Sequence, residues 1–75
     1  MSLGKMPVED LLRIAHAGGG FRLGAAHRYP DELVEIAAAA KTGGATVIFS
    51  GMARHYTDDL IRIATAGQGS VIFED

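Results

Sequence analysis

The sequence predicts a small α/β fold built from three consecutive helix-strand repeats, with a parallel sheet and the helices on one of its faces. Three observations lead to it: a repeated helical segment, a glycine stop after each copy, and a short β-prone run after each stop. Strands joined through helices pair in parallel with right-handed crossovers, and equal steps keep the helices on one face. We therefore expect strand order 1-2-3 in a single domain of residues 1–75.

The three expected helices share one residue pattern in segments 9–17, 31–39 and 58–66. Each segment reads two acids, Leu, an aliphatic residue, a charged residue, Ile, Ala, a variable residue and Ala, which gives one apolar helix face. The paired acids favour the positive end of the helix dipole. We expect Pro7 and Pro30 in first helical turns and Thr57 as an N-cap, and the second helix about one turn longer than its pattern segment. His16, at the variable position, is expected to face solvent.

Glycines follow each helical segment at 18–20, 43–44 and 67, as they do where helices end. The strands are expected within 20–24, 45–50 and 70–74, where β-branched and aromatic residues gather. Residues 47–49 and 71–73 are apolar at every position, as in strands buried on both faces. Helices cover one face, so we expect a second copy to cover the other or to pair with an edge strand.

These boundaries divide the chain into units 6–26, 27–53 and 54–75. We expect residues 1–5 to be flexible or vector-derived, with residues 1–3 as the remnant and Met6 or another residue as the native start.

The composition narrows the classes of function. With 48% hydrophobic and 21% charged residues the chain is expected to fold, but 75 residues bury only a small core. The chain has no cysteine, so self-association is the remaining route to extra stability, and we expect a cytoplasmic homodimer or higher oligomer. The net charge of −2 argues against a nucleic-acid partner, and no apolar run reaches the roughly 20 residues that span a bilayer.

A second repeat lies where each expected strand joins the next helix. Residues 24–33 and 51–60 share Gly, Ala, Tyr, Asp and Leu in register, with a His/Arg pair in exchanged order. The carboxyl ends of parallel strands are where ligands bind, and helix N-termini there offer N–H groups to anions. The candidate ligand- or partner-binding residues are His27, Arg28, Tyr29, Arg54, His55 and Tyr56.

Two interpretations of these joints remain open. Arg28 and Arg54 would hold an anionic or phosphorylated ligand, with the tyrosines stacking and the histidines moving protons. Alternatively, the joints are structural: the glycines provide positive φ, the tyrosines pack as hydrophobic staples, and the arginines pair with the acids that follow. We expect no metal, because no compact ligand spacing occurs, and no cofactor, because no phosphate-binding loop motif occurs. No residue is marked as catalytic.

The Leu-x-x-Ile-Ala segments, followed by glycine and a Val-Ile-Phe strand, resemble the short helix-strand units of leucine-rich-repeat solenoids. The leucine periods of 22 and 27 residues fit that range, and the resemblance covers residues 7–74. The consensus asparagine of those repeats is absent, so the resemblance concerns unit design and carries no functional residue. It implies a protein-binding repeat fold.

The sequence thus favours a non-enzymatic, self-associating α/β repeat module that mediates protein-protein interaction. The alternative is a binding protein or minor enzyme for a phosphorylated or anionic small ligand at the strand ends. Enzymatic activity is left open by the sequence. The expected partners are a second copy of the chain and another protein.

Overall fold

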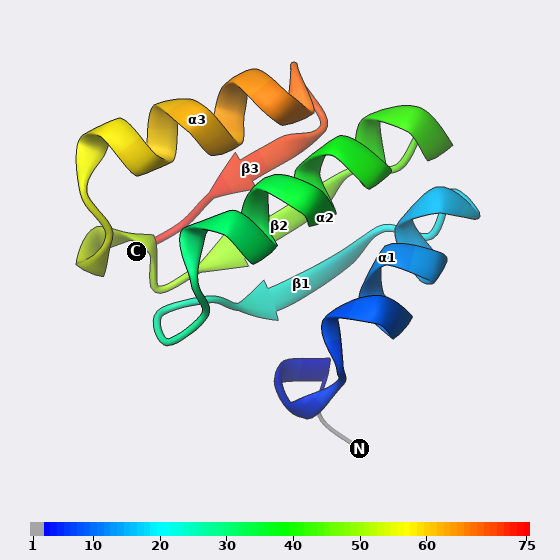
Figure 1. The fold of residues 1–75 in the computed structure, drawn as a ribbon, viewed down its shortest axis with the longest axis horizontal. Helices are drawn as coiled ribbons and strands as arrows, with labels where there is room; N and C mark the ends of the chain where they lie inside the picture. The colour runs from blue at the N-terminus through cyan, green and yellow to red at the C-terminus, as the bar shows by residue number, and fades with distance from the viewer. Residues whose placement is uncertain (1–2) are drawn as a thin grey trace.

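The computed structural model describes residues 3–75 and has the predicted fold class. Its three strands pair in parallel in the order β1-β2-β3, and they alternate with three helices (Figure 1). Residues 1–2, part of the segment expected to be flexible or vector-derived, lie outside the described residues. The elements are η1 (Leu3–Lys5), α1 (Val8–His16), β1 (Phe21–Gly24), α2 (Pro30–Gly43), β2 (Val47–Ser50), η2 (Met52–Arg54), α3 (Thr57–Gly67) and β3 (Val71–Phe73).

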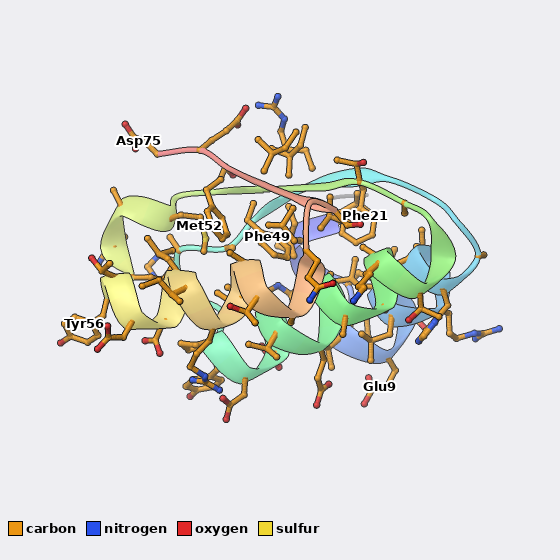
Figure 2. All side chains as sticks on the ribbon, turned by 90° about the horizontal axis from the view of Figure 1, so that it is seen from above. Glu9, Phe21, Phe49, Met52, Tyr56 and Asp75 are labelled. Atoms are coloured by element: carbon orange, nitrogen blue, oxygen red, sulfur yellow. The ribbon has the colours of Figure 1, made fainter. Side chains whose placement is uncertain are left out.

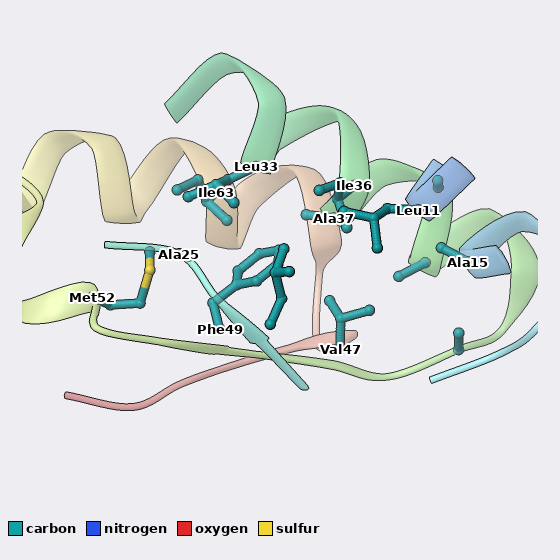
Figure 3. Close-up of a cluster of buried hydrophobic side chains, with 14 residues drawn as sticks. Leu11, Ala15, Ala25, Leu33, Ile36, Ala37, Val47, Phe49, Met52 and Ile63 are labelled. Carbon is teal, nitrogen blue, oxygen red and sulfur yellow. The ribbon is translucent and has the colours of Figure 1, made fainter. Parts of the chain in front are cut away.

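The molecule has two layers, with the helices packed on one face of the sheet (Figure 2). Alternate strand residues point into the space between the layers, because successive side chains of a strand face opposite ways. Val47 and Phe49 of β2 point toward the helices, where they meet the apolar helix faces (Figure 3). The largest fully buried side chains are Phe49, Leu11, Leu23, Leu33, Ile36, Ile63 and Val47.

Each helix begins one residue after a main-chain cap. Tyr56 is the N-cap residue of α3, and its carbonyl accepts hydrogen bonds from the N–H groups of Asp59 (3.0 Å) and Leu60 (3.1 Å). The expectation that Thr57 is the N-cap is wrong, because Thr57 is already helical, at the place that Pro30 takes in α2. No side chain caps either helix, so the extended backbone of the preceding tyrosine defines each start.

Two of the expected glycine stops lie inside helices. Gly43 ends α2 and Gly67 ends α3, and the chain turns into the left-handed region one residue later, at Gly44 (φ 73°) and Gln68 (φ 42°). Close packing explains the two helical glycines. A Cβ at Gly43 would collide with carbonyl oxygens at the end of α1, and one at Gly67 would lie 2.5 Å from Cγ2 of Val71. His16 is exposed at the end of α1, as predicted.

The sheet face without helices is less apolar than the sequence suggested. Arg22, Ile48 and Ile72 occupy one row of the register across the three strands. Arg22 Nη1 donates a hydrogen bond to Glu74 Oε1 at 2.9 Å, so this ion pair spans β2 from the first strand to the residue after the third. Ile48 is half-buried and Ile72 is exposed. This face therefore lacks the wide apolar surface that a second copy was expected to cover.

Among residues 3–75, no helix is both long and apolar enough to cross a membrane.

Candidate functional site

The two strand-to-helix joints lie side by side at the carboxyl end of the sheet, the end toward which the arrowheads point in Figure 1. We call residues 25–29 the first joint and residues 51–56 the second joint. The Ala25 N–H donates to the Ser50 carbonyl at 2.9 Å, and Ser50 Oγ donates to the Leu23 carbonyl at 3.3 Å. The register of β1 and β2 thus continues into the joints.

Gly51 allows the two joints to touch. Its φ of 75° lies in the left-handed region, which side chains rarely adopt. A Cβ there would also lie 2.9 Å from the Ala26 Cβ and 3.2 Å from the Ala26 nitrogen. This glycine is therefore required by both backbone conformation and space.

The joints are structural copies as well as sequence copies. Four of the five equivalent pairs have the same degree of burial, and the exception is Ala26, which is half-buried, with exposed Ala53. In order along each joint, the four pairs that agree are Ala25 and Met52 (buried), His27 and Arg54 (exposed), Arg28 and His55 (half-buried), and Tyr29 and Tyr56 (exposed).

The half-buried position of each joint anchors it to a main-chain oxygen of the first unit. Arg28 Nη2 donates to the Met6 carbonyl at 2.8 Å, at the start of the first unit. His55 Nε2 lies 2.8 Å from the Ala25 carbonyl of the first joint and donates to it in the tautomer that carries the proton there. Arg28 therefore ties the first joint to the start of the first unit, and His55 ties the second joint to the first joint, both through main-chain oxygens.

These anchors give a physical reason for the exchanged His/Arg order. At the half-buried position a side chain donates to a carbonyl of the first unit, and either an arginine or a histidine supplies such a donor. The neighbouring position is solvent-facing in both joints and carries the other residue type, His27 or Arg54. The six sequence-predicted residues thus divide into two anchors, Arg28 and His55, and four outward side chains.

Among the residues that the structure describes, the two tyrosines are the most exposed of the large hydrophobic side chains. Tyr29 is 76% exposed and Tyr56 is 82% exposed, both at the N-cap of a helix. The hydrophobic-staple interpretation is therefore wrong, since a staple buries its ring against the helix. Tyr56 projects from one end of the molecule in Figure 2.

The acids at the helix starts bind a different arginine from the ones expected. Arg62 of α3 donates to Asp31 at 2.7 Å and to Asp59 at 3.3 Å, which ties the start of α2 to α3. The hydrogen bond to Asp31 and the charge of its carboxylate raise the pKa of the Arg62 guanidinium. Arg54 remains exposed in the second joint.

A hollow of about 570 Å³ lies where the two strands end. His27 and Arg28 line it, together with Gly24, Ser50 and Gly51 near the junction of the joints. Arg54, His55 and both tyrosines are not among its lining residues. The arrangement can present main-chain groups and one guanidinium to a small anion, while the tyrosines and Arg54 lie outside the hollow.

Within residues 3–75, no group of three or more His, Cys, Asp or Glu side chains is placed to hold a metal ion. The Met6 carbonyl was not foreseen as part of the joints. No sequence signal marks it, because a main-chain oxygen is common to every residue.

Comparisons with models of protein families, with curated proteins and with solved structures found no match to this chain.

Proposed function

We propose that this chain is a small, non-enzymatic, self-associating α/β repeat module that binds a partner protein through its strand-end edge. The contact surface, which we call the tyrosine edge, consists of Tyr29, Tyr56, His27 and Arg54. The observation that carries the proposal is the exposure of two equivalent tyrosines, 76% and 82%, on adjacent joints.

The chemistry of this edge suits a protein partner. A tyrosine supplies a large amphipathic ring that loses little conformational entropy on binding, and tyrosine and arginine are enriched where binding energy concentrates. Exposed aromatic rings contribute nothing evident to the fold, whereas Arg28 and His55 have structural contacts. The repeat architecture places the two rings on neighbouring units, so one partner segment can contact both.

The proposal includes a cytoplasmic location, supported by the lack of cysteine. It includes no nucleic-acid partner, which the net charge of −2 disfavours.

The test compares protein capture by three immobilised forms of the chain. These are the wild type, the Tyr29→Ala/Tyr56→Ala variant, and a control in which exposed His16 and Thr65 become alanine. A lysate of the source organism is passed over each, and bound proteins are quantified by mass spectrometry. We expect one or a few proteins to be retained by the wild type and the control but reduced at least about tenfold on the tyrosine variant.

A direct measurement then confirms the contact with the recovered protein in purified form, by calorimetry against the same three forms. Equal capture by all three forms would contradict the tyrosine edge. Retention of no specific protein by the wild type would contradict the partner-binding function itself.

The hollow favours a second candidate function, the binding of a phosphorylated or anionic small ligand. Its support is the position of His27 and Arg28 on a concave surface at the carboxyl ends of two parallel strands. Arg28 also donates to the Met6 carbonyl, so its contribution to holding the ligand would be its positive charge.

Thermal unfolding with inorganic phosphate, nucleotides and sugar phosphates tests the ligand function. A ligand at 100 times its Kd should stabilise the fold by about 2.7 kcal/mol, a readily measured shift in Tm. The shift should be lost in the His27→Ala and Arg28→Ala/Arg54→Ala variants and kept in the His16→Ala control. If no compound raises the Tm of the wild type, this candidate is excluded.

A further inference from the structure

The two ends of the helix-strand stack are built differently. A stack of repeats buries each unit against its neighbours, so its first and last units expose surfaces that inner units cover. Here the first unit has a cap and the last unit has none among the described residues.

The cap of the first unit is η1 together with Met6. Residues 3–5 lie against β1, the first strand of the sheet, and both Leu3 and Met6 are half-buried against the core. The hydrogen bond from Arg28 to the Met6 carbonyl holds this cap in place. Figure 1 shows η1 beside the outer edge of β1.

The last unit exposes positions that the inner units bury. Ala15 and Ala37 are fully buried in α1 and α2, but the equivalent Ala64 of α3 is exposed. Val34 of α2 is half-buried and packs against the core, whereas the equivalent Ile61 of α3 is 57% exposed.

The same difference holds in the sheet. Phe49 of β2 is buried, whereas Phe73 of β3 is only half-buried. Ile72 of β3 is 48% exposed, and its neighbour in β2 is half-buried. The outer surface of the third unit therefore has the residue types of an inter-unit interface without an occupant among residues 3–75.

The open edge of β3 also carries main-chain groups. The Ser70 carbonyl accepts from Val47, and the Glu74 N–H donates to Phe49, so these residues face β2. Main-chain groups of alternate strand residues point the other way, which directs those of Val71 and Phe73 to the open edge. An unpaired strand edge of this kind is a template for another strand.

We propose that two copies of the chain join at this end through β3 and α3 around a two-fold axis, which gives one six-stranded sheet with a cap at each end. The proposal rests on the self-association in the proposed function and identifies its surface. A two-fold axis perpendicular to the sheet pairs β3 with its symmetry mate antiparallel and keeps all helices on one face. The exposed Ile61 and Ala64 of α3 then pack against the same helix of the second copy.

A head-to-tail stack is the competing arrangement. Within one copy, Arg62 of α3 forms an ion pair with Asp31 of α2. Arg13 of α1 is equivalent to Arg62, and Asp58 of α3 is equivalent to Asp31. A head-to-tail stack would therefore pair Arg13 of one copy with Asp58 of the next. In that arrangement β1 of one copy would pair with β3 of the next, but η1 lies against β1. The tail-to-tail dimer leaves the caps in place and ends after two copies.

The test is the oligomeric state of the full chain by sedimentation equilibrium across a wide concentration range. The wild type should form a dimer and no larger species. Ile61→Arg places a charge on the proposed contact and should raise the dimer Kd at least about tenfold. Ala38→Arg adds the same charge at an exposed position of α2, away from the proposed contact on α3, and should leave Kd unchanged. Ala64→Glu is the second contact variant, used if circular dichroism shows that Ile61→Arg does not fold.

Amide hydrogen exchange supplies an independent readout on the strand edge. The N–H groups of Val71 and Phe73 should be protected in the wild-type dimer and exchange rapidly in the monomeric variant, whereas the Glu74 N–H, bound to Phe49, keeps its protection.

Three results would overturn the tail-to-tail dimer. A wild type that stays monomeric also removes self-association from the proposed function, while the tyrosine-edge capture can still succeed. A dimer unaffected by Ile61→Arg and by Ala64→Glu removes only this surface. Open-ended assembly that Arg13→Glu weakens and an added Asp58→Arg restores would establish the head-to-tail stack instead.

Discussion

Replacing Gly43 by alanine is expected to destabilise the protein, although alanine favours a helix more than glycine does. Gly43 is the last residue of α2 and crosses the end of α1 closely. An alanine Cβ there would lie 2.6 Å from the His16 carbonyl oxygen and would collide with the Ala15 carbonyl oxygen. Both obstacles are main-chain atoms, so no side-chain rotation relieves the contact, and α1 and α2 have to separate.

The expected loss of unfolding free energy in Gly43→Ala follows from two opposing effects. Overpacking a close contact costs about 1–3 kcal/mol. Alanine regains at most about 1 kcal/mol of helix propensity, and less at the final helical residue. The net loss is about 1–2 kcal/mol of unfolding free energy. For a domain of this size that corresponds to a Tm lower by roughly 5–15 °C.

Urea denaturation and thermal melts followed by circular dichroism measure this effect. Thr42→Ala is the matched control, because Thr42 precedes Gly43 in the same turn and is exposed. It should change stability by no more than about 0.5 kcal/mol. If Gly43→Ala instead stabilises the protein as much as helix propensity alone allows, the close crossing of α1 and α2 is refuted.

Three further predictions concern contacts of the sheet, the helices and the core. Arg22→Ala removes the ion pair with Glu74 across the sheet and should cost no more than about 1 kcal/mol, with the loss shrinking in high salt, as urea denaturation at two salt concentrations would show. Asp31 raises the pKa of the Arg62 guanidinium. The charge of Arg62 therefore makes its full contribution to folding stability at every pH below the usual arginine pKa, and this contribution is lost only as the pH rises through the higher pKa of the folded state. The Tm difference between the wild type and Arg62→Ala should therefore stay constant from about pH 6 to 9. Phe49→Ala empties the centre of the core and should cost about 3–5 kcal/mol, enough to unfold most of a domain this small, which the loss of near-ultraviolet circular dichroism would report.

Most of the architecture could be predicted from the sequence because its signals are local. The pattern around Leu11, Leu33 and Leu60 repeats at helical spacing, and the runs at 47–49 and 71–73 are short and β-branched. Parallel pairing and the 1-2-3 order then follow from the connection rules. Helix boundaries moved by one residue at Thr57, Gly43 and Gly67, since local propensity does not include a neighbouring helix or strand.

Only part of the candidate site could be predicted from the sequence. The repeat identified both joints and all six candidate residues, but it did not separate anchors from outward side chains. Arg28 and His55 differ from His27 and Arg54 in their burial, and that depends on the carbonyl groups of Met6 and Ala25 nearby. Such contacts join residues 22 and 30 positions apart, so no local pattern records them.

The sequence by itself determined three repeated units, their helices and strands, and two equivalent joints at the strand ends. Tertiary structure alone decided three other features: the Arg22–Glu74 ion pair across the open sheet face, the position of η1 against β1, and the exposure of Ile61 and Ala64 at the last unit. The physical reason is that repetition gives each unit the same residues, while burial depends on neighbours. An identical position is core in an inner unit and surface in the last one, and only the assembled stack distinguishes them.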